Sequence, residues 1–257
     1  MEHSSLALGL AGLVVGLLVG LTGVGGGTLM TPLLLYLGFA PVDAVGTDLV
    51  YAAVTKTSGA YLHSRRHNVE WPLVGWLLLG SLPASLLTLV AWQRLIVPHT
   101  VQATTVKVLL GLILIGTGAL VLLRLSLRKP VAASPYEPTQ PPRKILTILL
   151  GALLGILVTL SSAGAGAVGA AALSLLFPRL SASKIIGSDL AHAVPLTLTA
   201  GLAHLATGHV HLWAVFWLCL GSIPALAVGS WLAPKVPERI LKPVMGTGLA
   251  LLGLTLV

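Results

Sequence analysis

Long stretches of this chain carry almost no charge. Apart from Lys107, no Asp, Glu, Lys or Arg occurs in residues 6–21, 73–92, 106–123 and 212–232. Most of these runs approach the roughly 20 residues that a helix needs to cross the hydrocarbon core of a bilayer. Only 9% of all residues are charged, against roughly 25% in soluble domains. The sequence therefore predicts an all-α, polytopic membrane protein.

The basic residues do not indicate a nucleic-acid partner. Lys and Arg number 15 and outnumber the 7 Asp and Glu, but nucleic-acid binding needs basic residues clustered on a solvated face. Here they lie in short gaps between apolar runs. We expect the lipid bilayer and no nucleic acid among the partners of the chain, and a homodimer is left open.

The chain contains an internal duplication. Gly-Thr-Asp-Leu at 46–49 recurs 141 residues later as Gly-Ser-Asp-Leu at 187–190, and Gly-Ser-Leu-Pro at 80–83 recurs at the same offset as Gly-Ser-Ile-Pro at 221–224. A fixed offset over so long a stretch indicates a repeated structural unit. The segment 128–144 contains five prolines, which exclude a spanning helix. We predict a first transmembrane repeat at 1–127, a Pro-rich linker at 128–144 and a second transmembrane repeat at 145–257.

Each repeat is expected to cross the membrane an odd number of times. The first holds two short apolar pieces that enter and return, 6–21 and 28–38, followed by three full spans, 43–63, 71–92 and 103–124. An odd count gives the two repeats inverted topologies, with about 8–10 segments in total, short or broken helices included. It also places 12 of the 15 basic residues on one side. By the positive-inside rule that side, which includes the linker, is cytoplasmic, and both termini are periplasmic to a bacterial inner membrane.

Each repeat has a run of small residues between its two short apolar pieces. Inverted repeats with interrupted helices are typical of secondary transporters, in which half-helix N-termini meet near the midplane. Bare N–H groups at a helix start favour an anion, so a small anionic substrate is expected. The alternative is that the small residues only allow close helix packing. The candidate substrate-binding residues here are Thr22, Gly23, Val24, Gly25, Gly26 and Gly27 in the first repeat, and Ser161, Ser162, Gly164 and Gly166 in the second.

Four ionisable residues of the predicted spans are candidates for a role in transport. Lys56 is the one base about midway along a span, and it joins the candidate substrate-binding set because it could supply the positive charge that an anion meets. Asp48, Asp189 and His192 are candidates for binding a coupling ion or relaying a proton, because acids inside a membrane are costly unless used. The alternatives stay open: the aspartates could cap helix N-termini, Lys56 could form a structural ion pair, and His192 could be structural.

The sequence contains no motif that is typical of an enzyme. The glycine run lacks the Gly-Lys-Ser or Gly-Lys-Thr of a nucleotide-binding loop, and no multi-His metal spacing or nucleophile elbow occurs. We predict no catalytic residues, no metal site and no cofactor.

Several motifs together resemble the sulfite exporter TauE/SafE family. They are Gly-Leu-Thr-Gly-Val-Gly-Gly-Gly at 20–27, Thr-Pro-Leu-Leu-Leu at 31–35, Ala-Val-Gly-Thr-Asp-Leu at 44–49 and Gly-Ser-Asp-Leu at 187–190. The resemblance spans both halves and implies export of sulfite, sulfoacetate or related sulfur-containing anions from the cytoplasm. The second repeat departs from the pattern, because Ser-Ser-Ala-Gly-Ala-Gly-Ala at 161–167 replaces a fuller glycine run.

The sequence thus predicts a secondary transporter that exports sulfite or a related anion, such as sulfoacetate or another organosulfonate, held between the two repeats at helix N-termini. One alternative is a channel or cation/proton exchanger centred on Asp48 and Asp189. A membrane sensor without transport is another. A third is a thiosulfate carrier that uses the thiol of Cys219, the one cysteine of the chain.

Overall fold

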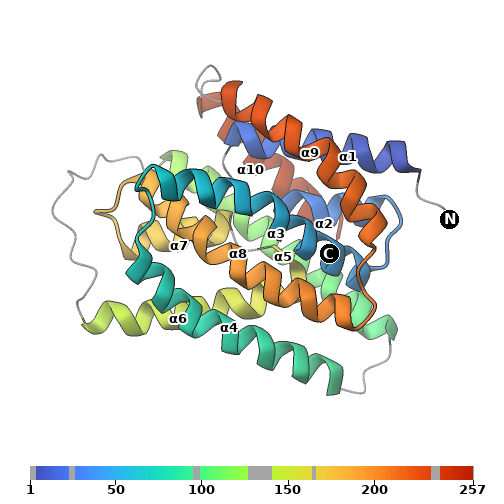
Figure 1. The fold of residues 1–257 in the computed structure, drawn as a ribbon, viewed down its shortest axis with the longest axis horizontal. Helices are drawn as coiled ribbons and strands as arrows, with labels where there is room; N and C mark the ends of the chain where they lie inside the picture. Colours follow the sequence, from blue (N-terminus) through green and yellow to red (C-terminus); the bar gives the residue numbers. More distant parts are fainter. Residues whose placement is uncertain are drawn as a thin grey trace.

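The computed structural model describes residues 4–22, 27–94, 99–126, 141–163, 166–232 and 238–256. These residues form helices joined by short turns and loops, with no strand among them (Figure 1). The helices are α1 (Ser5–Thr22), α2 (Gly27–Tyr36), α3 (Pro41–Arg65), α4 (Trp71–Arg94), α5 (His99–Ser126), α6 (Pro141–Ser161), α7 (Ala167–Leu176), α8 (Ala182–Ala206), α9 (Leu212–Leu232) and α10 (Glu238–Leu254). The all-helical fold class is confirmed, and α1 to α5 match the five segments expected for the first half to within a few residues.

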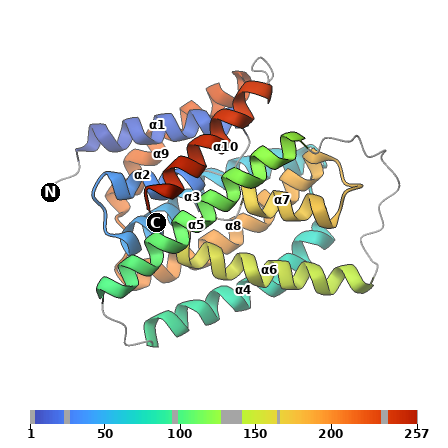
Figure 2. The same ribbon diagram turned by 180° about the vertical axis from the view of Figure 1, so that it is seen from behind.

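The helices of the two halves correspond at the offset found in the sequence. Helices α3 and α8 have 25 residues each, and α2 and α7 have 10 each. The start of α8 lies 141 residues after the start of α3. Helix α1 packs along α9 on one side of the molecule, and the corresponding pair α6 and α4 packs on the other, with α3 and α8 between them (Figures 1 and 2).

Corresponding helices that touch each other run antiparallel. A Cβ added to Gly46 near the start of α3 would stand 3.0 Å from the Cβ of His204 near the end of α8, and a Cβ added to Gly187 near the start of α8 would stand 3.1 Å from that of His63 near the end of α3. The corresponding helices α5 and α10 also pack on each other, with Gly118 beside Ala250. The two-fold relation between the halves is therefore perpendicular to the helices, which is the geometry of inverted-topology repeats.

Glycines set the close approach of the outer helix pairs. Gly12, Gly16 and Gly20 recur every four residues on α1, and a Cβ on any of them would collide with the backbone of α9. Gly151 and Gly155 on α6 have the same relation to the backbone of α4. Small residues spaced in this way let helices pack tightly where lipid supplies no hydrophobic driving force between them. At these positions the glycines serve packing.

Four of the described helices are long and apolar enough to cross a membrane, judged by length and composition. They are Trp71–Trp92, Arg143–Ser161, Ala182–Ala206 and Leu212–Leu232. Helix α3 corresponds to the third of these and has the same length, but it carries Asp43, Asp48, Lys56 and Arg65. Of the two central helices, α3 is thus less apolar than α8.

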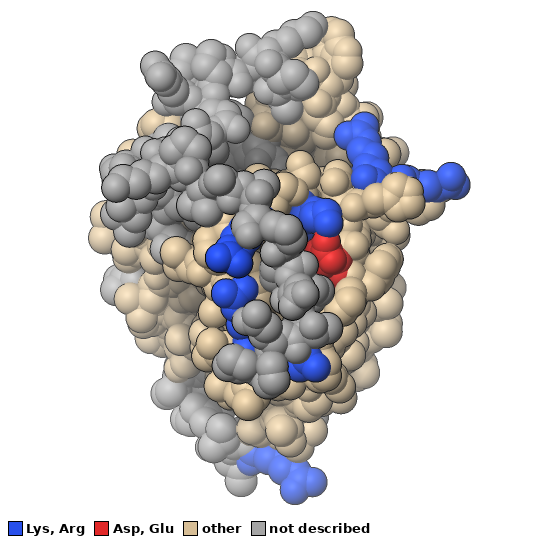
Figure 3. All heavy atoms as spheres, turned by 90° about the vertical axis from the view of Figure 1, so that its left-hand side faces the viewer, with Lys and Arg blue, Asp and Glu red and all other residues tan. Residues whose placement is uncertain are grey.

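Basic side chains gather at one end of the bundle, where α3 ends and α6 and α8 begin (Figure 3). The Lys184 ammonium forms an ion pair there with Glu70, which precedes α4. Arg143 lies over the ring of Phe177, and Lys144 lies over the ring of Trp76. We call this end the basic end and the other, where α3 begins and α8 ends, the far end.

Candidate functional site

Helices α3 and α8 bring the four predicted intramembrane ionisable residues together at the centre of the bundle. Asp48 and His192 are fully buried, Asp189 is 2% exposed and Lys56 is 4% exposed. Lys56 interacts electrostatically with Asp189 and with Asp48, and His192 is close enough to Lys56 to feel its charge. We call these four residues the central cluster.

The repeated Gly-Thr-Asp and Gly-Ser-Asp elements explain how the aspartates are placed. Gly46 and Gly187 leave room for the carbonyls of His209 and Asn68, which belong to the opposite half. The next residue of each element is a hydroxyl that accepts a hydrogen bond from a loop of the opposite half. The Thr47 hydroxyl accepts from the His211 backbone N–H at 3.1 Å, and the Ser188 hydroxyl accepts from the Glu70 backbone N–H at 2.9 Å. The first two residues therefore fasten the halves together, and the aspartate follows on the inner face.

Helix capping is not the role of these aspartates. The N-cap residues of α3 and α8 are Ala40 and Ser181, and the Ser181 side chain accepts from the backbone N–H of Lys184. Asp48 and Asp189 lie two turns further along their helices. The capping interpretation is wrong because α3 begins at Pro41 and α8 at Ala182, well before the two aspartates.

Asp48 is surrounded by hydroxyl groups. The Thr31 hydroxyl of α2 donates to one oxygen of its carboxylate, and Ser162 lies beside the carboxylate at the end of α6. The other oxygen, Oδ1, is buried and has no hydrogen-bond partner among the described residues. A carboxylate that receives hydroxyl donors is stabilised in its charged form.

Asp189 has a poorer supply of donors. The positions equivalent to Thr31 and Ser162 in the other half are Ala172 and Leu21, neither of which has a polar side chain. Its Oδ1 is buried without a hydrogen-bond partner in the part of the chain that the structure describes, and a Cβ on Gly169 in the first turn of α7 would collide with that oxygen. The electrostatic partner of Asp189 is Lys56.

Lys56 breaks the symmetry of the site. Its equivalent in α8 is Thr197, whose hydroxyl bonds the carbonyl of Ala193 within its own helix. If Asp48 and Asp189 are both ionised and His192 is neutral, the central cluster carries a net charge of one minus; if one carboxyl is protonated, the cluster is neutral. Burying such a set is costly unless the charges compensate one another, so the charge state of the two carboxyls and of Lys56 is linked.

His192 and Tyr51 occupy equivalent positions, and each faces a serine of the repeated Gly-Ser-x-Pro element. The ring nitrogen Nε2 of His192 lies 2.9 Å from the Ser81 hydroxyl of α4. Tyr51 lies beside Ser222 of α9. Both serines are fully buried. The repeated element can be seen in the sequence, but its serine could not be assigned to the site from the sequence. Its contact with a residue of the site appears only when the helices are packed together.

The structure describes only some of the predicted substrate-binding residues. Gly23, Val24, Gly25, Gly26 and Gly164 lie outside the described residues. Thr22 ends α1 and Gly27 begins α2, as expected for an interrupted helix. The Ser161 hydroxyl donates to the Leu157 carbonyl at 2.7 Å and is engaged by its own helix. Ser162 has a φ of 55° and Gly166 a φ of 130°, so the chain turns sharply between α6 and α7.

Comparisons with known proteins agree with this architecture. The family model of the sulfite exporter TauE/SafE matches residues 8–256. The chain is 38% identical over 255 residues to the probable membrane transporter protein YjnA of Bacillus subtilis (strain 168), covering 98% of this chain and 100% of that protein. It is 25% identical over 249 residues to the probable membrane transporter protein YdhB of the same organism, covering 95% and 96%. No solved structure matches the chain. The chain belongs to the sulfite exporter TauE/SafE family and is a membrane transporter.

Proposed function

We propose that this chain is a secondary transporter that exports sulfite, or a related small sulfur-containing anion such as a sulfonate, across a bacterial inner membrane. The observation that carries the proposal is that the buried Lys56 interacts electrostatically with both Asp189 and Asp48, on the two central helices. The family description supplies the substrate class. The site supplies a buried positive charge, Lys56, and a substrate anion could take the place of one of its carboxylate counter-charges.

The charge balance of the central cluster links anion binding to protonation. An anion approaching Lys56 competes with two carboxylates that already neutralise it. Unlike charges attract strongly and like charges repel strongly where water is excluded, so an anion gains most when one carboxyl is protonated. Binding of the substrate and of a proton then favour each other, which is the thermodynamic basis of coupled transport.

Asp189 is the carboxyl that takes the proton in this proposal. Asp48 accepts a hydrogen bond from Thr31 and lies beside Ser162, so its charged form has donors. Asp189 has Ala172 and Leu21 at the corresponding positions. Loss of the Asp189 charge removes one of the two carboxylate counter-charges of Lys56, which favours the approach of an anionic substrate.

Alternating access would use the inverted halves, 1–127 and 145–257, joined by the linker 128–144. At the basic end, the loop before α4 bonds α8 through Ser188 and Glu70. At the far end, the loop before α9 bonds α3 through Thr47 and His211. Rocking of one half against the other would break one set of contacts while the other is kept, as in transporters built from inverted repeats. The positive-inside rule favours a cytoplasmic basic end and linker, with periplasmic termini.

Flux in proteoliposomes tests the proposal. The native protein should give saturable sulfite flux that sulfoacetate inhibits, and Lys56→Ala should abolish it. Lys107→Ala is the matched control, because Lys107 is an exposed lysine on another helix; this variant should transport like the native protein. Absence of flux for sulfite, sulfoacetate and thiosulfate in the native protein would rule out the substrate assignment.

A cation/proton exchanger is the second candidate, and one observation favours it. The central cluster contains two carboxyl groups, each with a buried oxygen that lacks a hydrogen-bond partner among the described residues, and such oxygens suit a cation. In that case proton flux would depend on Na⁺ or K⁺ and would persist when sulfite is absent. Thiosulfate transport through the thiol of Cys219 has weaker support, because Cys219 lies partly buried against the hydrophobic cluster between α1 and α9; retained thiosulfate flux in Cys219→Ala would exclude that chemistry.

A further inference from the structure

The far end of the bundle carries a group of ionisable side chains that the central cluster does not include. Nδ1 of His209 lies 2.8 Å from Oδ1 of Asp43, and Nε2 of His211 lies 3.5 Å from Oδ2 of the same carboxylate. His204, one turn back on α8 and 7% exposed, interacts electrostatically with both His209 and Asp43. A carboxylate and three imidazoles thus lie together between the surface and the interior.

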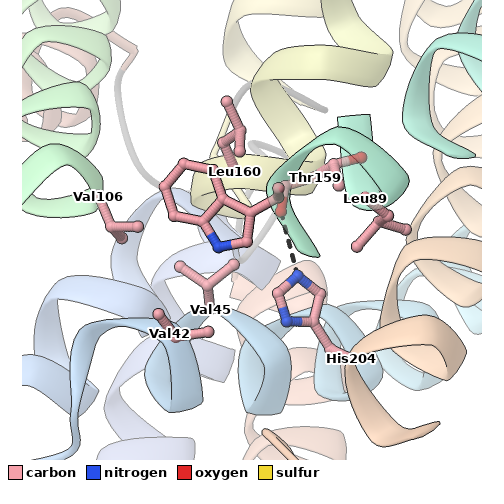
Figure 4. Close-up of a pocket in the computed structure, with 8 residues that line it drawn as sticks. Val42, Val45, Leu89, Val106, Thr159, Leu160 and His204 are labelled. Carbon is pink, nitrogen blue, oxygen red and sulfur yellow. Dashed lines mark hydrogen bonds between the residues drawn. The ribbon is translucent and has the colours of Figure 1, made fainter. Parts of the chain in front are cut away.

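The interior side of this group opens on a small apolar pocket that His204 and Thr159 share (Figure 4). Nε2 of His204 lies 3.3 Å from the Thr159 carbonyl. The pocket volume is about 10 Å³, close to the lower limit for one water molecule. His204 and Thr159 are the lining residues with polar side chains. The remaining lining residues are apolar or aromatic: Val42, Val45, Leu89, Trp92, Val106 and Leu160.

Beyond the pocket, buried hydroxyl groups lie on the way to the central cluster, with one turn of α4 between Ser85 and Ser81. The Thr159 hydroxyl of α6 lies 2.7 Å from the Ser85 hydroxyl of α4 and 2.6 Å from the Gly155 carbonyl of its own helix. It has one proton, so when it donates to Gly155 it accepts from Ser85. Ser81 lies four residues before Ser85, so the two share a face of α4, and its hydroxyl lies 2.9 Å from Nε2 of His192. Thr159 is 1% exposed, and the two serines are fully buried. Each hydroxyl can donate and accept a proton in turn.

The equivalent path in the other half is interrupted. The positions that correspond to Thr159 and Ser85 are Leu18 and Leu226, whose side chains can neither donate nor accept a hydrogen bond. The residues that correspond to Asp43 and His211 are Lys184 and Glu70, and they form an ion pair at the basic end. A polar chain therefore reaches the centre from the far end, while leucines stand in its place toward the basic end.

We propose that the residues from Asp43 and His209 through His204, Thr159, Ser85 and Ser81 to His192 form a proton pathway between the far end and the central cluster. This pathway rests on the proposed transport function and assigns the proton as its coupling ion. An imidazole can accept a proton at one ring nitrogen and release one from the other, and a hydroxyl passes a proton by accepting one and releasing another. The path carries protons between the far side of the membrane and Asp189, which lies one helical turn before His192.

The test uses full-length protein in proteoliposomes, with two measurements on each variant. Exchange of labelled sulfite at equal concentrations on both sides needs no net proton movement. Proton movement driven by a sulfite gradient is followed with an entrapped pH-sensitive dye. Thr159→Val keeps the shape of the side chain and removes the hydroxyl, Thr159→Ser keeps the hydroxyl, and His204→Gln removes the imidazole. His63→Gln, at the position equivalent to His204, is the matched control.

We expect Thr159→Val and His204→Gln to exchange sulfite within about twofold of the native rate, and proton movement to fall by roughly tenfold or more. Thr159→Ser and His63→Gln should keep both activities. Unchanged proton movement in Thr159→Val and His204→Gln, with normal exchange, would overturn the pathway and leave the transport function standing. Loss of both activities in these two variants, with normal folding by thermal melting, would also overturn it. If the native protein exchanges no sulfite, the proposed function fails and the pathway fails with it.

Discussion

Asp48 and Asp189 lie 141 residues apart on two antiparallel helices, and both interact with the same lysine, Lys56. The duplication thus produced two acids and one base at the point where the halves cross. The surroundings of the two acids differ, since Thr31 donates to Asp48 while the corresponding position near Asp189 is Ala172. The two equivalent carboxyl groups therefore have unequal surroundings.

Removal of the Lys56 charge should destabilise the protein. Lys56→Met leaves two buried carboxyls without their cation, and breaking a buried ion pair by removing one partner costs about 3–5 kcal/mol. The loss should be partly recovered in Lys56→Met combined with Asp189→Asn, because the second change removes the uncompensated charge. Thermal melting of the native, single and double variants in detergent, arranged as a double-mutant cycle, measures the coupling. Strictly additive effects would show that the two residues do not interact.

The glycine positions along α1 should differ sharply in their tolerance of a methyl group. A Cβ on Gly16 would collide with the backbone of Ser222, whereas a Cβ on Gly9 meets nothing within 4 Å. Gly16→Ala should therefore lower stability by about 1–3 kcal/mol through overpacking. Gly9→Ala on the same helix should be neutral or slightly stabilising. Melting temperatures of the two variants in one detergent provide the check, and equal effects would contradict the close packing of α1 on α9.

Gly169 should be required for transport more than for folding. A Cβ there would collide with Oδ1 of Asp189, so Gly169→Ala must displace that carboxylate from its place at the start of α7. We expect sulfite flux to fall strongly while the melting temperature changes by a few degrees. Gly248→Ala serves as control, because a Cβ on Gly248 meets nothing within 4 Å. Native flux in Gly169→Ala would show that the position of Asp189 does not matter.

At the basic end, loss of the Ser188 hydroxyl should lower the free energy of unfolding more than loss of the Lys184–Glu70 ion pair. Ser188 accepts from the backbone N–H of Glu70, and Ser188→Ala leaves a partly buried N–H without that acceptor, at a cost of about 1–3 kcal/mol. The side chains of Lys184 and Glu70 are 42% and 18% exposed, so Glu70→Gln should cost about 0–1 kcal/mol. Raising the salt concentration should weaken only the ion pair. Chemical denaturation of both variants at low and high salt measures the two losses of stability. A larger loss in Glu70→Gln than in Ser188→Ala would refute the prediction.

The helices and the duplication could be predicted from the sequence because the same motifs occur twice at a fixed offset. The fixed offset between Gly-Thr-Asp and Gly-Ser-Asp identified α3 and α8 as counterparts, and the apolar runs gave the helices to within a few residues. The aspartates could not be assigned to a cap or to the interior, because that distinction depends on where α3 and α8 begin.

The hydroxyl chain was beyond the reach of sequence reasoning. Thr159, Ser85 and Ser81 lie on two different helices, and single hydroxyls in apolar helices are common and carry no pattern. Their significance appears only when α4 and α6 are packed together, which brings the Thr159 and Ser85 hydroxyls within 2.7 Å. The packing of α4 against α6 brings these hydroxyls together, and their spacing along the chain does not reveal that proximity.

Leu18 and Leu226, which stand where the other half has Thr159 and Ser85, give the molecule an insulating side. A membrane stores energy as a difference in proton concentration and voltage, and a continuous hydroxyl wire from face to face would discharge it. In the proposed pathway, hydrocarbon at these two positions would confine proton transfer to one half of the bundle, and the rest of the crossing would require movement of the protein.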